Sequence, residues 1–313
     1  MLESPGFWER SGFAGRASKW RGTATKGPCC CRRRDPIAGT VGACHDASSV
    51  PHDQGAPDTV RRELQGVAIR AWEQHRAAEV AGLAHVVRPS IPILFFGDSK
   101  AYLASPLRAV SVGLNPSCDE FPRAAPYCRF PGGERLDGSD PEAYLAALDG
   151  YFRHDPYKRW FSPSFESLLR GMGASYCDGV GSVALHTDLC SPLATDPTWS
   201  RLSPQERTVL EVDGGKLWHE LLEILQPSVV LVSVRRALLQ EIRFPLAGPP
   251  RVIHTVDGPR RRRPYVVEGC RRELRSGKKP LFVFGLASQT PFGSISAFEK
   301  RAIGARLLEV LDG

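Results

Sequence analysis

The sequence has no pair of cysteines at the C-x-x-C spacing, and its nine cysteines are an odd number. Zinc sites and iron–sulfur clusters are usually built from such closely spaced ligand pairs. The run Cys29 to Cys31 lies near His45, but its spacing fits none of the usual ligand patterns. We therefore expect no metal site.

Long apolar runs are also missing. No stretch approaches the roughly 20 residues of a membrane span, and the N-terminus lacks the apolar core of a signal peptide. The sequence contains no G-x-G-x-x-G or P-loop segment, which argues against a dinucleotide or triphosphate site. With 42% hydrophobic and 24% charged residues, the composition is that of an ordinary globular protein. We expect a cytoplasmic protein with no membrane association and no obligatory protein partner.

The positive charge of the chain is concentrated in one region. The net charge is +7, yet residues 235–280 hold thirteen Lys and Arg against four Asp and Glu. Such a patch is typical of proteins that bind a polyanion such as nucleic acid; the alternative is a solvated basic loop. Four consecutive arginines within it are the candidates for contacts to DNA phosphates: Arg260, Arg261, Arg262 and Arg263.

Residues 1–57 differ from the rest of the chain. They are rich in Gly, Ser, Ala, Arg and Pro and show no sustained apolar period. We interpret them as a disordered extension or as an over-long gene start. Order is expected to begin at Asp58, and residues 58–313 are expected to form one domain.

Buried strands alternate with amphipathic helices along residues 58–313. Four apolar runs have the character of strands that are buried on both faces: 108–113, 181–186, 228–233 and 280–285. Residues 92–97 indicate a further strand, and a basic hairpin-like region separates the third and fourth runs. The alternation predicts an α/β fold, a three-layer α/β/α sandwich around a central, mainly parallel four-stranded sheet.

Distinctive polar segments follow three of the four buried strands. The first reads GLNPS and contains Asn115, the second contains Thr187 and Asp188, and the third spans residues 287–294. The carboxyl ends of parallel strands meet at one edge of a sheet, where α/β proteins bind their ligands. We therefore expect these segments to share a pocket, although an Asn-Pro pair often only starts a turn.

These segments resemble the uracil-DNA glycosylase superfamily, and most closely its mismatch-specific and single-strand-selective branches. GLNPS is similar to the family's GxNPG-type motif, with Ser117 in place of the last glycine. GSVALHTDLCSPLATDP and SQTPFGSIS stand where the family has its second strand and its DNA-penetrating loop. The resemblance runs from about Pro92 to the end of the chain. It implies a monofunctional DNA N-glycosylase that needs no cofactor and has DNA as its partner.

The resemblance also implies roles for individual residues. Asn115 would position the hydrolytic water, and Phe130 or Phe161 would stack on the flipped base, although most aromatic side chains only fill cores. Phe292 would act as an apolar wedge in the DNA. The remaining candidates are Gly113, Thr187 and Asp188 in the base pocket, and Ser288, Gln289 and Thr290 on the DNA backbone.

Departures from the family pattern bear on the substrate. Ala287 or Ser288 stands where several branches have a histidine, and Asp188 stands where uracil-reading branches present an amide. A carboxylate only accepts hydrogen bonds, so it suits the exocyclic amine of cytosine. We therefore expect a modified cytosine, such as a hydroxymethylated or glucosylated cytosine of phage DNA, and a role in antiviral defence. Asp188 would lose this role if it were a helix cap or an ion-pair partner away from the pocket.

Three alternatives remain open from the sequence. The first is a repair glycosylase for uracil or mismatched thymine, and the second is a non-catalytic reader of modified DNA. The third is a nucleotide or small-molecule hydrolase on a generic α/β sheet, which no phosphate-binding segment supports.

Overall fold

The computed structural model describes residues 55–177, 181–257, 264–285, 292 and 295–312. These residues belong to one compact unit, Ser48–Gly313. Helix α1 (Gly55–Val80) begins three residues before the expected start of order at Asp58. The rest of the predicted N-terminal extension lies outside the described residues.

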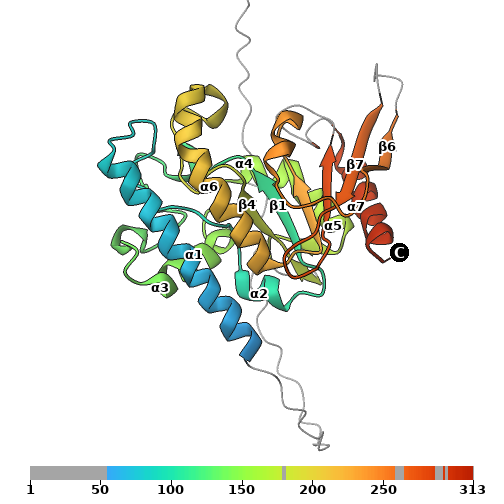
Figure 1. Ribbon diagram of the computed structural model, residues 1–313, viewed down its shortest axis with the longest axis horizontal. Helices are drawn as coiled ribbons and strands as arrows, with labels where there is room; N and C mark the ends of the chain where they lie inside the picture. Colours follow the sequence, from blue (N-terminus) through green and yellow to red (C-terminus); the bar gives the residue numbers. More distant parts are fainter. Residues whose placement is uncertain (1–54, 178–180, 258–263, 286–291, 293–294, 313) are drawn as a thin grey trace, which may run out of the picture. The chain divides into compact units, whose positions relative to one another are not determined.

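The described unit is an α/β structure with a six-stranded, mostly parallel central sheet (Figure 1). The strands follow the order β4, β1, β5, β8, β7, β6. The first four are mutually parallel, whereas β7 and β6 are antiparallel to their neighbours. In chain order the strands are β1 (Ala109–Gly113), β4 (Leu185–Asp188), β5 (Val229–Val232), β6 (Arg251–Val256), β7 (Tyr265–Arg271) and β8 (Leu281–Gly285).

The predicted number of strands in the sheet, four, was therefore wrong, because the sheet has six. The runs 108–113, 228–233 and 280–285 form β1, β5 and β8, whose residues are buried. The run 181–186 is divided: Ser182–Val183 form a strand of a separate small sheet, and only the last two residues of the run belong to β4, which continues to Asp188. The basic region between β5 and β8 adds the antiparallel strands β6 and β7. Most residues of the edge strand β6 are exposed or half-buried, so its apolar pattern is weak.

Residues 92–97, which were predicted to be a strand, form no strand either. They run as a buried segment with a single bridge, between Phe96 and His186 of β4. Pro92 has no N–H to donate, and Gly97 has a positive φ of 118°. Extended pairing therefore ends after one bridge, although the segment still packs into the core.

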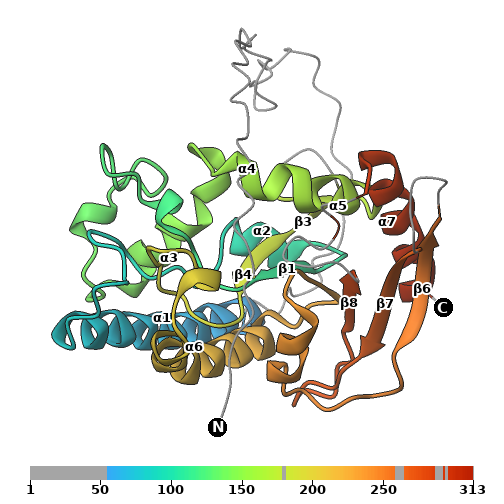
Figure 2. The same cartoon turned by 90° about the horizontal axis from the view of Figure 1, so that it is seen from above.

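Helices cover both faces of the sheet (Figure 2). Helices α1 and α6 (Pro204–Leu225) lie on one face, and α4 (Lys158–Phe161), α5 (Ser167–Gly171) and α7 (Ala297–Asp312) lie on the other. The unit also contains two short helices, α2 (Ser99–Ala104) and α3 (Pro141–Asp149), and a small parallel pair of strands, β2 (Ala174–Ser175) and β3 (Ser182–Val183). No helix of the described residues has the length and apolar character that a membrane span requires.

Capping boxes at Ser203 and Ser296 mark where two of the helices begin. The Ser203 hydroxyl accepts the Glu206 N–H at 3.2 Å, and the Glu206 carboxylate accepts the Ser203 N–H at 2.7 Å. Ser296 and Glu299 make the same reciprocal pair at 3.1 and 2.6 Å. Each box satisfies backbone donors that the first helical turn leaves without a partner, and so fixes where α6 and α7 begin.

Two glycines allow α5 and α7 to pack backbone against backbone. A Cβ added at Gly304 of α7 would lie 2.2 Å from the carbonyl oxygen of Leu168, and one added at Gly171 would lie 2.2 Å from that of Arg301. Both obstructing atoms are backbone atoms, so neither can move aside without shifting a helix.

We expect Gly304→Ala to destabilise the protein by about 1–3 kcal/mol, the usual cost of overpacking a core. This cost exceeds the roughly 1 kcal/mol by which alanine is preferred over glycine inside a helix. Urea denaturation measures the difference. The control is Gly66→Ala in α1, whose Cβ would meet only the Arg70 side chain, at 3.8 Å, and which should be neutral or stabilising. Equal stability of Gly304→Ala and the parent protein would contradict close packing here.

Candidate functional site

The carboxyl ends of β1, β4 and β5 surround one pocket of about 330 Å³. This volume is at the small end of the roughly 300–1,000 Å³ of ligand pockets. Four residues predicted for the site lie in its wall: Gly113, Asn115, Phe161 and Asp188. The structure thus brings together two of the three predicted segments, those that contain Asn115 and Asp188, whereas most of the third, residues 287–294, lies outside the described residues.

The loops after β1 and β4 continue to pair beyond the strands. The Cys190 N–H donates to the Leu114 carbonyl at 2.8 Å, and the Thr195 N–H donates to the Pro116 carbonyl at 3.2 Å. Ser117 and Thr195 form a further bridge. The loop that carries Asn115 is therefore held against its neighbour by backbone hydrogen bonds.

Asn115 is held in one orientation by three acceptors. Its side-chain NH₂ lies 2.8 Å from the Pro116 carbonyl oxygen, 3.2 Å from that of Leu193 and 3.0 Å from the Thr195 hydroxyl. Because two of these three groups can only accept a hydrogen bond, the amide nitrogen must face them. The Asn115 Oδ1 atom therefore faces the other way, and no described residue donates a hydrogen bond to it.

Asp188 is buried in the pocket wall beside His186. The Asp188 Oδ1 atom lies 3.6 Å from the His186 Nε2 atom, which is longer than a hydrogen bond. The His186 Nδ1 atom is 2.8 Å from the Ser111 hydroxyl, which in turn contacts the hydroxyl of Tyr176. This chain of contacts fixes the His186 ring. Asp188 caps no helix in this structure and contributes directly to the pocket.

Gly113 makes room for the Asp188 carboxylate. A Cβ at this position would lie 2.5 Å from Asp188 Oδ1 and 3.1 Å from His186 Nε2. The glycine is needed because the carboxylate occupies the space that a side chain would fill.

We expect Gly113→Ala to displace the Asp188 carboxylate and to reduce ligand binding in the pocket roughly tenfold or more, because a site built on fixed polar groups loses affinity when they move. Titration with a DNA oligonucleotide, the partner expected from the sequence, provides the measurement. The matched control is Gly215→Ala, whose Cβ would have only one neighbour, a backbone oxygen at 3.9 Å. If the two variants bind equally well, Gly113 does not support Asp188.

The sequence interpretation missed Glu120, a buried carboxyl group in the same pocket wall. The Tyr151 hydroxyl donates to Glu120 Oε2 at 2.6 Å, and the Arg129 Nε atom lies 3.8 Å from the same oxygen. Burial raises the pKa of Glu120 to about 7, against the opposing effects of Tyr151 and Arg129, and the negative charge of Asp188 adds to the increase. A carboxyl group of this kind in a pocket is typical of a functional site.

Of the predicted pocket residues Phe130, Phe161 and Thr187, only Phe161 lines the pocket. Phe161 lines the pocket, with its ring centroid 5.0 Å from that of His186. Phe130 is fully buried against Phe121 and is not among the residues that line the pocket. The Thr187 hydroxyl accepts the indole N–H of Trp218 at 3.1 Å and faces the core. Of the two candidate stacking residues, only Phe161 is in a position to contact a base in the pocket.

The residue predicted as a wedge, Phe292, is fully buried in this structure. Its ring packs against Phe165 and Tyr265, and its backbone N–H donates to the Tyr265 hydroxyl at 2.7 Å. Phe292 thus fills the core in this conformation and does not project from the surface as a wedge must.

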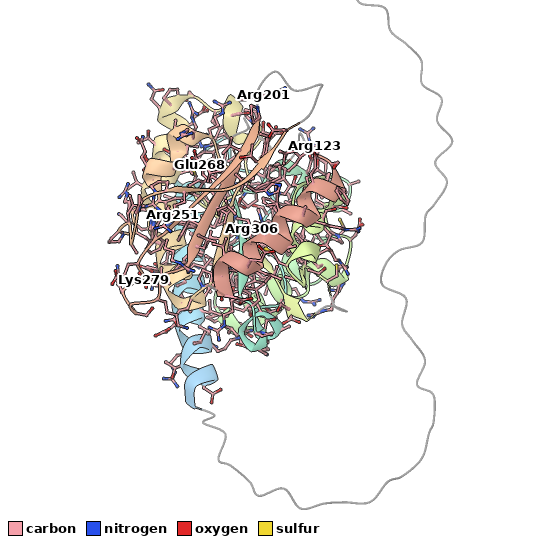
Figure 3. All side chains as sticks on the ribbon, turned by 90° about the vertical axis from the view of Figure 1, so that its right-hand side faces the viewer. Arg123, Arg201, Arg251, Glu268, Lys279 and Arg306 are labelled. Carbon is pink, nitrogen blue, oxygen red and sulfur yellow. The ribbon has the colours of Figure 1, made fainter. Side chains whose placement is uncertain are left out.

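The predicted DNA-contacting residues lie outside the described part of the chain: Ser288, Gln289, Thr290, Arg260, Arg261, Arg262 and Arg263. Other cations are near the pocket. Arg235, directly after Ser233 and Val234 beyond β5, is exposed and lines the pocket. Arg201 is exposed two residues after Trp199, and Figure 3 shows Arg201 and Arg123 at the end of the molecule away from Lys279.

Two further wall residues carry buried polar atoms without a hydrogen-bond partner among the described residues. These are the indole N–H of Trp199 and the hydroxyl of Ser233. Ser233 follows β5 directly, so the strand-end argument could have identified it. Trp199 carried no such signal, because it lies in a short 3-10 helix (Trp199–Arg201) after an irregular loop.

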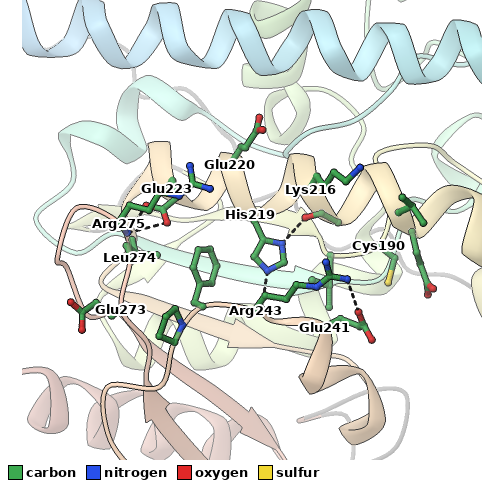
Figure 4. A pocket seen from close by; sticks show the side chains of 16 residues that line it. Cys190, Lys216, His219, Glu220, Glu223, Glu241, Arg243, Glu273, Leu274 and Arg275 are labelled. Carbon is green, nitrogen blue, oxygen red and sulfur yellow. Dashed lines mark hydrogen bonds and ion pairs between the residues drawn. The ribbon is translucent and has the colours of Figure 1, made fainter.

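A second hollow, of about 600 Å³, lies beside α6 and contains none of the predicted site residues (Figure 4). His219 spans it: its ring is 2.6 Å from the Gly215 carbonyl oxygen and accepts the Arg243 N–H at 2.9 Å. Burial lowers the pKa of His219, so the ring is a neutral structural link. Among the described residues, no group of three or more His, Cys, Asp and Glu is arranged to hold a metal ion.

Comparison of the chain with protein-family models, with curated proteins and with solved structures gave no match. The pocket at the strand ends is therefore the basis for a proposed function.

Proposed function

We propose that the protein is a DNA glycosylase that turns a modified pyrimidine out of DNA and hydrolyses its N-glycosidic bond, leaving an abasic site. The observation that carries this proposal is the orientation of Asn115. Its NH₂ group is held by three protein acceptors, so the opposite oxygen is presented without a partner from the described residues. An amide oxygen held in this way can accept a hydrogen bond from a water molecule and direct it at a sugar carbon.

The pocket suits a flipped base. A base inside a duplex is out of reach, so an enzyme that acts on it must extrude it into a pocket and stack it between apolar walls. Phe96, Phe161 and Trp160 supply aromatic walls next to Asn115. Arg235 at the pocket adds positive charge for the phosphates. The likeness of the GLNPS segment to the uracil-DNA glycosylase superfamily supports the same assignment.

Asp188 favours a cytosine derivative as the substrate. Its carboxylate accepts hydrogen bonds and would repel the O4 carbonyl of uracil, whereas it matches the exocyclic amine of cytosine. Excision of ordinary cytosine would destroy the host genome. A hydroxymethylated or glucosylated cytosine of phage DNA is therefore the proposed substrate, and antiviral defence in the cytoplasm is the proposed role.

The test is abasic-site formation on oligonucleotides that contain uracil, mismatched thymine, cytosine, hydroxymethylcytosine or glucosylated hydroxymethylcytosine. We expect release of a modified cytosine only. Release of uracil or thymine would make the protein a repair glycosylase and contradict the role given to Asp188. Tight binding to modified DNA without release of any base would make it a reader.

A further inference from the structure

Glu120 stands five residues after Asn115, at the end of the 3-10 helix η1 (Cys118–Glu120). It is 4% exposed and shares the pocket wall with Asp188. The Tyr151 hydroxyl donates to Oε2 at 2.6 Å and accepts the Tyr157 N–H at 2.9 Å. The Tyr151 hydroxyl, itself held by the Tyr157 N–H, thus holds the Oε2 atom of Glu120 in place. The other, Oε1, receives no hydrogen bond from the described residues.

Charged and titratable groups from four segments act on this carboxyl group. Tyr151 belongs to the 3-10 helix Tyr151–Arg153, Arg129 to the loop before Phe130, Asp188 to the end of β4, and Asp119 to η1 itself. Asp188 and Asp119 disfavour a charge on Glu120, and Tyr151 and Arg129 favour it. Burial is the largest influence, so the pKa rises to about 7. Near neutral pH, a large fraction of the molecules therefore carry a proton on Glu120.

We propose that Glu120 is the proton donor to the departing base, and that the Glu120 acid and the Asp188 carboxylate together read the edge of a cytosine-type base. This inference rests on the proposed glycosylase function. Cytosine presents an acceptor, N3, beside a donor, its exocyclic amine, and these match a carboxylic acid O–H beside a carboxylate. Uracil presents the reverse order, N3–H beside O4. With uracil, the Glu120 O–H would therefore meet the N3–H donor, and the Asp188 carboxylate would meet the O4 acceptor.

The chemical step balances with these groups alone. The bond between C1′ of the sugar and N1 of the base breaks, and its electron pair leaves with the base. The Glu120 proton passes to N3, so the base departs as a neutral molecule rather than as an anion. The water directed by Asn115 bonds to C1′ through its oxygen. Its surplus proton goes to solvent, from which the Glu120 carboxylate is reprotonated. One water molecule thus hydrolyses one glycosidic bond and gives a free base and a sugar hydroxyl.

The experiment is the pH dependence of single-turnover base release, measured for the full chain on DNA that contains hydroxymethylcytosine, or whichever base the panel identifies. We expect the wild-type rate to fall as the pH rises past about 7, as Glu120 loses its proton. Glu120→Gln keeps an N–H donor but has no proton to transfer. It should be slower by about 10²–10⁴-fold at pH 6 and independent of pH, with unchanged DNA affinity. Glu134→Gln, at an exposed residue of the 3-10 helix Gly133–Arg135, is the matched control and should behave as wild type.

A second variant separates this role from a structural one. The Tyr151 hydrogen bond lowers the pKa of Glu120, so Tyr151→Phe should move the fall in rate to higher pH. Two results would overturn the assignment of Glu120 while leaving the glycosylase proposal intact. One is that the rate of Glu120→Gln falls with rising pH as the wild-type rate does. The other is that the fall in Tyr151→Phe occurs at the same pH as in wild type. Failure of the wild-type protein to release any base overturns the glycosylase proposal itself, and this inference with it.

Discussion

Replacement of Asn115 by alanine is expected to slow base release by about 10²–10⁴-fold, the usual contribution of a group that positions or activates a reacting water. Under the proposed function, alanine removes the oxygen that would hold the water and changes no other group proposed to contact DNA. The affinity for DNA should therefore remain that of wild type. Abasic-site formation and fluorescence anisotropy on the same oligonucleotide measure the two quantities separately.

Asn115→Asp sharpens this prediction. A carboxylate has no N–H group, so one of its oxygens would face the carbonyl oxygens of Pro116 and Leu193, at the 2.8 and 3.2 Å now spanned by hydrogen bonds. We expect this variant to be as inactive as Asn115→Ala and less stable than it. Thr195→Val is the milder control, because it removes one of the three acceptors and leaves both carbonyls. Full activity in Asn115→Asp would show that the amide orientation does not matter.

Replacement of Arg61 by alanine should destabilise the protein by about 3 kcal/mol, the low end of the effect of removing one partner of a buried ion pair, because Asp149 is buried whereas Arg61 and Glu142 are partly exposed. Arg61 of α1 donates to both carboxylate oxygens of Glu142 at 2.8 Å and to Asp149 at 3.2 Å. Asp149 is 6% exposed and also binds Ser99. Without Arg61, a buried carboxylate lacks its cation, and α1, α2 and α3 lose their shared link.

Urea denaturation checks this value, and Arg62→Ala is the control because Arg62 is exposed on the same helix. The pH dependence gives a second check. The Arg61 hydrogen bond lowers the pKa of Glu142 to about 2 from a usual value of 4.5. The pair therefore stabilises the folded state above pH 4.5, and this contribution is lost as the pH falls towards 2. The acid sensitivity should be smaller in Arg61→Ala; identical acid profiles would contradict the link.

The parts of the fold that could be predicted are those that sequence-local patterns determine. β1, β5 and β8 are short apolar runs because both of their faces are covered by helices, and such runs are visible without a structure. β4 contains His186, Thr187 and Asp188 and has no such run, so its bounds were predicted too early in the chain. β7 was missed as a sheet strand because Glu268 interrupts its apolar run and because its partner β6 is an exposed edge strand.

The site was predicted where it follows from strand ends and missed where it depends on distant packing. Asn115, Gly113 and Asp188 each lie at or just beyond the end of a buried strand. The burial of Glu120 depends on Tyr151, which lies 31 residues away, and no local pattern records such a contact. Phe292 illustrates the opposite error, since an aromatic residue in a loop was read as projecting when it packs into the core.

The Asn-Pro sequence at the pocket also has a consequence for the lifetime of the protein. Asn115 is the only asparagine among the 313 residues. Asparagine side chains age by deamidation, which begins when the backbone nitrogen of the next residue loses its hydrogen and attacks the side-chain carbonyl carbon. Pro116 has no hydrogen on its nitrogen, so this route is closed at Asn115. The amide whose conversion to aspartate would disable the proposed chemistry is thus protected by its neighbour from this route of deamidation.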